Sequence, residues 1–150
     1  MHNRQKTAFT MIELVFVIVV LGILSAIAIP KFSVTRTDAQ ISKGRADISS
    51  IRSAIVTERQ SRLIKGDSSW INTLSHTPYT TLFDGNGTVS LLMYGIKPGN
   101  TDGHWSRTGT NAYTFHVGGK NCTFTYDGAG KFDIGNTADD NSTICQNLVH

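Results

Sequence analysis

A nearly continuous apolar run between Phe9 and Pro30 limits what this chain can fold into more than any other feature of its sequence. Of the 22 residues in the run 17 are apolar, and Glu13 is its only charged residue. A helix of the 21 residues 9–29 would span about 31 Å at a rise of ~1.5 Å per residue. The hydrocarbon core of a bilayer has about this thickness, so the run is long enough to cross a membrane.

The rest of the 150-residue chain is much more polar and contains no second long apolar run, which excludes a polytopic membrane protein. Its 13 aromatic residues and its strand-like patterns exclude full disorder. The chain has only three prolines, and its glycines recur without a period, which together exclude a collagen-like chain. We therefore expect one membrane-length segment followed by one small globular unit.

Charge is distributed unevenly around the net value of +3. Residues 31–65 carry +5, whereas residues 66–150 carry −3. Opposite charges on two parts of one chain would let copies attract one another, and the alternative is a solvated basic helix face. The acidic C-terminal part argues against contact with nucleic acid.

Three interpretations of the apolar run compete: a permanent anchor, a cleaved secretory signal, and a segment that leaves the membrane to pack in an assembly. Residues 26–28 (AIA) match the small-x-small pattern of a secretory cleavage site. Against that interpretation, Glu13 lies inside the run and the helical pattern continues past Pro30. The proline is then predicted to kink one long helix.

Glu13 is the informative residue of the run. An acidic side chain near the centre of a membrane helix costs about 2.5–3.5 kcal/mol on insertion scales, and less near its end. Such a residue requires a partner or a function, unless it lies at the level of the lipid headgroups. Gly22 and Pro30 weaken a helix and are candidates for a flexible part of it, although Gly22 is equally suited to close helix packing.

The N-terminal residues resemble a known family. Residues 6–14 (KTAFTMIEL), the long apolar run of residues 15–29 and the Pro30-Lys31-Phe32 sequence resemble the class III signal and N-terminal helix of type IV pilins and type II secretion pseudopilins. The resemblance covers residues 5–45 and does not extend clearly to residues 66–150.

This resemblance implies that a prepilin peptidase cleaves between Ala8 and Phe9 on the cytoplasmic side and methylates the new amino group of Phe9. Residues 1–8 would be the leader peptide that is removed. The family usually has glycine before the cleavage site, where this chain has Ala8. Glu13 would then pair with the N-terminal amine of a neighbouring subunit, and a buried pair of this kind penalises a misplaced subunit because both charges lose their partner.

The amphipathic pattern after Pro30 predicts that residues 31–66 continue the helix to about Lys65, with Gly66 closing it. Its apolar stripe consists of Ile41, Ile48, Ile51, Ile55 and Leu63. The polymerisation helix, residues 9–30, would thus be the first half of a helix whose second half carries a globular domain.

Residues 67–150 are predicted to form a β-rich domain. We expect a short helix at residues 70–74, a strand at residues 89–96, and an antiparallel meander of strands at residues 112–117, 122–126 and 131–134. The predicted fold is α+β and pilin-like, with the long helix covering the apolar face of a small antiparallel sheet.

Cys122 and Cys145 are predicted to form a disulfide. A bridge that closes this 24-residue loop would contribute roughly 3.5 kcal/mol to a small domain. The alternative is two free thiols, since the spacing does not suit zinc. A C-terminal disulfide loop resembles type IV pilins more than the usual major pseudopilin.

No catalytic signature is present in the sequence, and we expect neither an enzyme nor a bound cofactor. Asp127, Asp133, Asp139 and Asp140 are weak candidates for calcium, which major pseudopilins bind in a C-terminal loop, and the alternative is turn formation. Residues 84–88 and 139–143 resemble the extended acceptor pattern of bacterial N-glycosylation.

The function that the resemblance implies is that of a pseudopilin, a structural subunit of a type II secretion or type IV pilus-like filament. Its partners would be copies of itself, minor pseudopilins or pilins, prepilin peptidase and an inner-membrane assembly platform. It would span the bacterial inner membrane once, with its C-terminal domain in the periplasm or in an extracellular filament. The alternatives are a type IV or competence pilin for adhesion, motility or DNA uptake, and a monomeric membrane-anchored binding domain.

Overall fold

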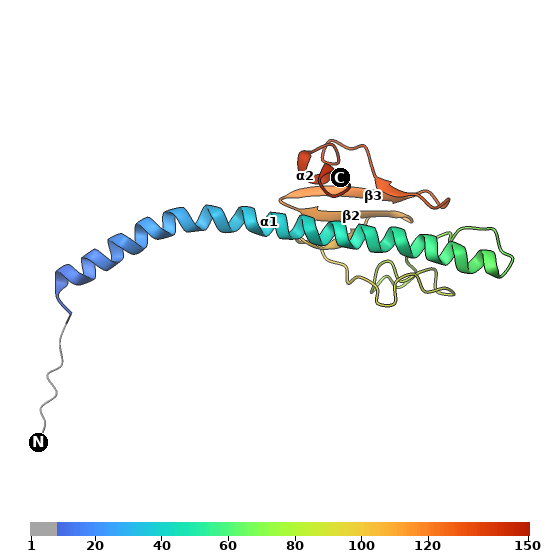
Figure 1. Ribbon diagram of the computed structural model, residues 1–150, viewed down its shortest axis with the longest axis horizontal. Helices are drawn as coiled ribbons and strands as arrows, with labels where there is room; N and C mark the ends of the chain where they lie inside the picture. The colour runs from blue at the N-terminus through green and yellow to red at the C-terminus, as the bar shows by residue number, and fades with distance from the viewer. Residues whose placement is uncertain (1–8) are drawn as a thin grey trace, which may run out of the picture. The chain divides into compact units, whose positions relative to one another are not determined.

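A computed structural model describes residues 9–150, with no description of the side chains of residues 29, 30 and 32–34 (Figure 1). The predicted leader, residues 1–8, lies outside the described residues. The chain divides into two compact units at residues 36 and 37, and each is considered by itself.

Helix α1 (Met11–Ile64) contributes to both units, and its bounds include Pro30. Gly66 ends the helix in the left-handed conformation, with φ of 82°. The amide of Gly66 bonds to the carbonyl of Leu63 at 3.0 Å and the amide of Asp67 bonds to that of Arg62 at 2.9 Å. This is a Schellman cap, and it satisfies two carbonyls that the end of the helix leaves without a partner. The predicted closing role of Gly66 is confirmed.

The sheet has four antiparallel strands in the order β1-β2-β3-β4 (Figure 1). Its strands are β1 (Trp105–Arg107), β2 (Ala112–Val117), β3 (Lys120–Tyr126) and β4 (Phe132–Ile134). The predicted meander is confirmed, and β1 is an additional strand. Gly118 and Gly119 join β2 to β3 with positive φ angles of 56° and 73°, which suit a two-residue hairpin turn. Together, α1 and this sheet confirm the predicted α+β, pilin-like class.

The core lies between the second half of α1 and the sheet. Ile48, Ile51 and Ile55 of α1 are buried there, and Ile41 is half-buried against them. The predicted stripe is wrong at its last position, because Leu63 in the final turn is 51% exposed. Aromatic residues supply much of the opposing surface, among them Phe83, Trp105, Tyr113, Phe115, Phe124 and Phe132.

Two further predictions are wrong, both in the segment between α1 and β1. Residues 89–96 form no strand apart from a bridge between Leu82 and Ile96, because Leu91 and Leu92 are both half-buried and Met93 and Tyr94 are both exposed. Consecutive residues with the same burial do not follow the alternation of a strand.

Residues 70–74 form no helix. Three nearby carbonyls accept hydrogen bonds from distant side chains: that of Ser69 from Arg59 at 2.8 Å, that of Ile71 from Tyr126 at 2.8 Å, and that of Asn72 from Asn111 at 2.9 Å. Tertiary partners therefore satisfy the acceptors that a helix would have used.

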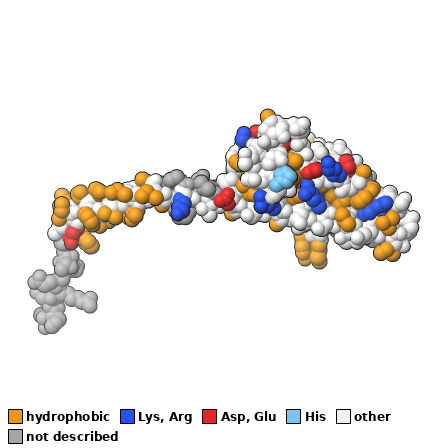
Figure 2. Space-filling model, turned by 45° about the horizontal axis from the view of Figure 1, so that its top comes forward, with side chains coloured by type: hydrophobic (Ala, Val, Ile, Leu, Met, Phe, Trp, Pro, Cys, Tyr) orange, Lys and Arg blue, Asp and Glu red, His pale blue; other side chains and the backbone are white. Residues whose placement is uncertain are grey.

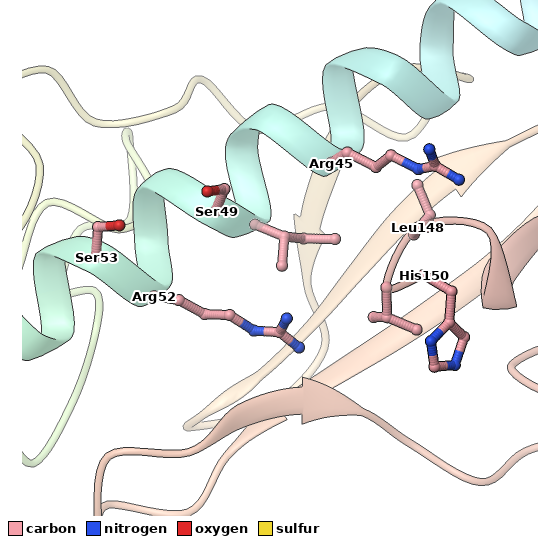
Figure 3. A pocket seen from close by; sticks show the side chains of 8 residues that line it. Arg45, Ser49, Arg52, Ser53, Leu148 and His150 are labelled. Carbon is pink, nitrogen blue, oxygen red and sulfur yellow. The ribbon is translucent and has the colours of Figure 1, made fainter.

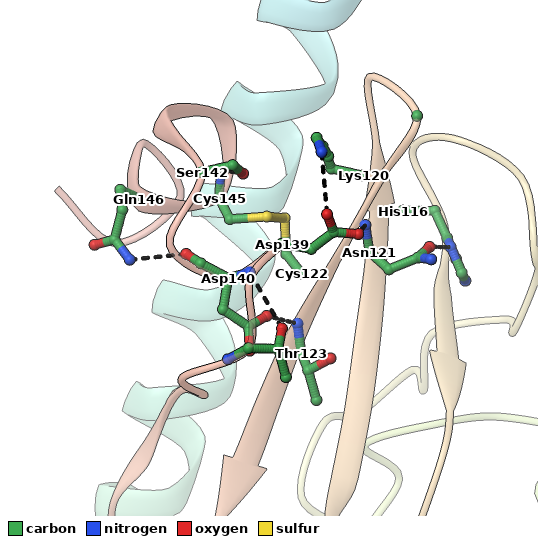
Figure 4. Close-up of a disulfide and its surroundings, with 12 residues drawn as sticks. His116, Lys120, Asn121, Cys122, Thr123, Asp139, Asp140, Ser142, Cys145 and Gln146 are labelled. Carbon is green, nitrogen blue, oxygen red and sulfur yellow. Dashed lines mark hydrogen bonds and ion pairs between the residues drawn. A yellow bond between two sulfur atoms is a disulfide. The ribbon is translucent and has the colours of Figure 1, made fainter.

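The predicted disulfide between Cys122 and Cys145 is confirmed and joins β3 to the short helix α2 (Thr143–Gln146) (Figure 4). Ser142 caps α2 by accepting a hydrogen bond from the amide of Cys145. Asp140, which is fully buried, accepts hydrogen bonds from the amides of Thr123 at 2.6 Å and Thr137 at 2.9 Å. The C-terminal segment is thus attached to the sheet by one covalent bond and a carboxylate.

Candidate functional site

The first turn of α1 is stabilised by reciprocal hydrogen bonds between Thr10 and Glu13. The amide and the hydroxyl of Thr10 each donate to Oε2 of Glu13 at 2.8 Å, and the amide of Glu13 donates to the Thr10 hydroxyl at 3.3 Å. This arrangement is a capping box, in which a threonine and a glutamate three residues later satisfy amides at a helix start. Glu13 therefore has a partner in its own chain, and its pairing with the amine of a neighbouring subunit stays a prediction.

The apolar segment that follows is exposed along its length. Every large hydrophobic side chain that the structure describes between Phe9 and Ile27 is at least 37% exposed. Met11–Ala28 is long and apolar enough to cross a membrane. Figure 2 shows hydrophobic side chains along the visible face of this part of the helix. The described residues of the first unit bury none of this apolar segment. The segment therefore requires lipid or other protein around it.

The sequence predicts that Gly22 and Pro30 make this segment flexible, with close helix packing as the alternative for Gly22. Apart from the nearby backbone of its own helix, a Cβ atom at Gly22 would meet no described atom within 4 Å, so close packing there would need a second molecule. The side chain of Pro30, like Ala8, lies outside what the structure describes. Their roles stay predictions.

We refer to the second unit, Thr37–His150, as the compact unit. In it, polar side chains of α1 fix the helix to the sheet. Asp47 accepts a hydrogen bond from the Trp105 indole at 3.0 Å. Arg52 donates to the carbonyl of Phe132 at 2.9 Å and to the carboxylate of Asp133 at 3.1 Å. Burial raises the pKa of the Asp47 carboxyl above its ordinary value. These two residues tie α1 to the two edge strands, β1 and β4.

Each candidate calcium ligand has protein partners. Asp127 accepts hydrogen bonds from the amides of Ala129 and Lys131 in the turn before β4, and the first of these bonds lowers its pKa most. Lys120 donates to Asp139 at 3.0 Å and lowers its pKa (Figure 4).

Within residues 9–150 no three histidine, cysteine, aspartate or glutamate side chains are placed to hold a metal ion.

The two candidate glycosylation sites lie in loops. Asn86 accepts hydrogen bonds from the amides of Thr88 and Val89, and Asn141 is exposed before α2. Their modification stays a prediction.

Sequence reasoning missed one polar network on the outer face of the sheet. Nε2 of His116 on β2 lies 2.8 Å from the Ser106 hydroxyl on β1, and its Nδ1 lies 2.8 Å from Oδ1 of Asn121 on β3. The alternation of polar residues along β2 and β3 signalled this face, but β1 was not foreseen. The network connects three strands through their side chains and so supports the sheet.

Comparison with known proteins finds a motif at the N-terminus and relatives that match part of the chain. Residues 3–29 match the prokaryotic N-terminal methylation motif. The type II secretion system core protein G of Pseudomonas aeruginosa is 36% identical over 55 residues, which are 37% of this chain and 39% of that protein. A fimbrial protein of Pseudomonas aeruginosa is 30% identical over 92 residues, which are 61% of this chain and 55% of that protein.

The chain thus spans between 39% and 55% of the length of these curated relatives. No solved structure matches it. The resemblance predicted from the N-terminal residues to pilins and type II secretion pseudopilins is confirmed.

Proposed function

We propose that this chain is a pseudopilin, a structural subunit of a type II secretion or type IV pilus-like filament. A prepilin peptidase would cleave it between Ala8 and Phe9 and methylate the new N-terminus. The observation that carries the proposal is the exposed apolar first half of α1, which coincides with the methylation motif over residues 3–29.

An apolar helix of this kind has two suitable environments. Lipid covers it before assembly, and the same segments of other copies replace the lipid in a filament, because either environment removes its side chains from water. One face of the second half of α1, with Ile48, Ile51 and Ile55, is buried against the sheet. One helix can therefore serve as the filament core and as part of the domain on the filament surface.

The partners in this proposal are copies of the chain, minor pseudopilins or pilins, prepilin peptidase and an assembly platform in the inner membrane. The chain would span the bacterial inner membrane once, with residues 67–150 in the periplasm or in an extracellular filament. Its role would be structural, with no catalysis and no cofactor.

A type IV pilin is the second candidate function, and two observations favour it. The disulfide encloses a C-terminal loop, as in type IV pilins, and the match to the fimbrial protein covers more of the chain than the match to core protein G. A strain that lacks this chain would distinguish the two by losing either protein secretion or pili.

Mass spectrometry of the mature N-terminus tests the filament proposal. The expected result is a chain that begins at N-methylated Phe9 and sediments as a polymer that electron microscopy resolves as filaments. A mature chain that begins at Ile29 would identify a secreted domain. An intact Met1 on a monomer would identify a simple membrane anchor, and either result would contradict the proposal.

A further inference from the structure

Two large hydrophobic side chains project from the loop between α1 and β1. Met93 is 85% exposed and its neighbour Tyr94 is 81% exposed, although almost all other large hydrophobic residues of this loop are at least half-buried. We refer to Met93 and Tyr94 as the apolar knob. Methionine and tyrosine are enriched in protein interfaces, and tyrosine is enriched among the few residues that contribute most of the binding energy.

Backbone hydrogen bonds hold both ends of the knob. The amide of Leu92 donates to the carbonyl of Phe83 at 3.0 Å, and Leu82 and Ile96 exchange two hydrogen bonds of 2.7 Å. Gly95 lies between the knob and Ile96, where a Cβ atom would be 2.8 Å from the Cβ atom of Thr81. The knob is thus fixed in an exposed position before any partner binds, which lowers the entropic cost of binding.

A groove of about 300 Å³ lies elsewhere on the same unit, between α1 and the C-terminal segment (Figure 3). Val149, which is half-buried, forms its apolar floor together with Ile48 and Leu148, which are each 2% exposed. Ser49 lines the α1 side, and Arg45 and Arg52 lie on either side of Ile48 along the helix. Figure 3 shows the two arginine side chains extending from α1 toward the C-terminal segment. The groove therefore combines an apolar surface with the positive charge of Arg45 and with Arg52, whose charge is paired with Asp133.

Both arginines are held in place by their own hydrogen bonds. Nε of Arg45 donates to the carbonyl of Asn147, and Nε of Arg52 donates to that of Phe132. Such bonds lie in the plane of the guanidinium group and leave its faces free to stack on an aromatic ring. The Arg52 side chain is 41% exposed, so a partner can reach it.

We propose that the apolar knob of one copy inserts into this groove on the next copy. Met93 would cover the apolar floor, and the Tyr94 ring would stack on a guanidinium group of Arg45 or Arg52. Charge favours the same partner, because residues 66–96, from which the knob projects, contain two aspartates and no lysine or arginine.

The two surfaces differ and lie on the same chain, so their contact is head-to-tail and leaves a free knob and a free groove at the ends. A contact of this kind propagates into an open helical polymer when its rotation does not close a ring. The inference rests on the proposed function and specifies which surfaces of the compact unit meet in the filament.

Cysteine crosslinking in assembled filaments tests the proposal. The full-length variant Met93→Cys/Ser49→Cys places one thiol on the knob and one beside the groove, and both native residues are exposed. After mild oxidation, we expect a ladder of dimers, trimers and larger products on a non-reducing gel. Met93→Cys/Thr125→Cys is the matched control, because Thr125 is exposed on the outer face of the sheet, and we expect no ladder from it. Peptide mapping should find Cys122–Cys145 intact in both variants.

Filaments of Met93→Cys/Ser49→Cys that give no ladder, or no more than the control, would overturn the knob-and-groove contact and leave the proposed function intact. A wild-type chain that forms no filament would overturn both. As a second measurement, Met93→Ser/Tyr94→Ala should reduce polymer yield about tenfold or more without changing the melting temperature of the dispersed subunit. Wild-type yield from this variant would also overturn the contact.

Discussion

The carboxylate of Asp47 on α1 accepts a hydrogen bond from the indole of Trp105 on β1 at 3.0 Å. Trp105 is fully buried and Asp47 is partly buried, so the indole N–H has an acceptor inside the protein.

Asp47→Ala should lower the free energy of unfolding by about 1–3 kcal/mol, because it leaves a buried indole N–H without an acceptor. Asp47→Asn keeps an acceptor oxygen and should stay within about 1 kcal/mol of the wild type. Urea unfolding of the full-length chain in mild detergent measures both, and equal losses would contradict a role for the hydrogen bond.

The burial of the Asp47 carboxylate also predicts that the stability of the folded chain depends on pH. Burial raises the pKa of Asp47 in the folded chain, so the folded state holds this proton more tightly than the unfolded state does. Asp47 therefore disfavours folding at neutral pH, and this penalty is lost as the pH falls through the raised pKa toward the unfolded value of about 3.9. The stability of Asp47→Asn relative to the wild type should decrease over that pH range. A difference that does not change with pH would exclude this explanation.

Gly44 allows α1 to approach the sheet closely. A Cβ atom there would lie 2.7 Å from side-chain atoms of both Leu148 and Phe115. Gly44→Ala should destabilise the compact unit by about 1–3 kcal/mol, because the core has no room for a methyl group. Gly22→Ala is the matched control, since a Cβ atom there meets nothing within 4 Å. We expect thermal unfolding of the compact unit to be unchanged by the control and shifted downward by Gly44→Ala.

The disulfide should contribute strongly to a domain of this size. Cys122→Ala/Cys145→Ala should lower the free energy of unfolding by roughly 3.5 kcal/mol, because the unfolded chain regains the freedom that the loop closure removed. Reduction of the wild type with dithiothreitol should give the same loss, which separates the effect of the bond from that of the substituted side chains. Unchanged unfolding after complete reduction would show that the hydrogen bonds around Asp140 hold the segment without the bond.

Three variants separate the charge of Glu13 from its capping role. Glu13→Gln keeps the capping geometry and loses the charge, Thr10→Ala loses the cap and keeps the charge, and Glu13→Ala loses both. If Glu13 pairs with the amine of a neighbouring subunit, both Glu13 variants should be cleaved and inserted in the membrane but polymerise poorly. Thr10→Ala should still polymerise. Electron microscopy and N-terminal mass spectrometry give the readouts, and normal filament yield from Glu13→Gln would contradict the ion pair.

The N-terminal half of the protein was predictable from sequence because its signals are local. The apolar run, the methylation motif and the closing glycine at Gly66 each depend on neighbouring residues. The strands of the meander were also found, since alternating side chains and glycine turns mark them. The pairing of Cys122 with Cys145 followed because the chain has only two cysteines.

Tertiary structure decided what lies between α1 and the meander. The carbonyls of residues 69, 71 and 72 bond to side chains outside this segment, on α1, on β3 and just before β2, which prevents the short helix that the local pattern favoured. Residues 89–96 form a loop that exposes both Met93 and Tyr94 to solvent. Buried and exposed side chains therefore do not alternate along it as they would in a strand. The groove lined by Arg45 and Arg52 exists only because the C-terminal segment returns to α1. By itself, the sequence determined that this chain has an exposed apolar helix in need of partners, because hydrophobicity is a local property. Only the folded domain decided which of its surfaces are available to those partners, because each surface is built from segments that are distant along the chain.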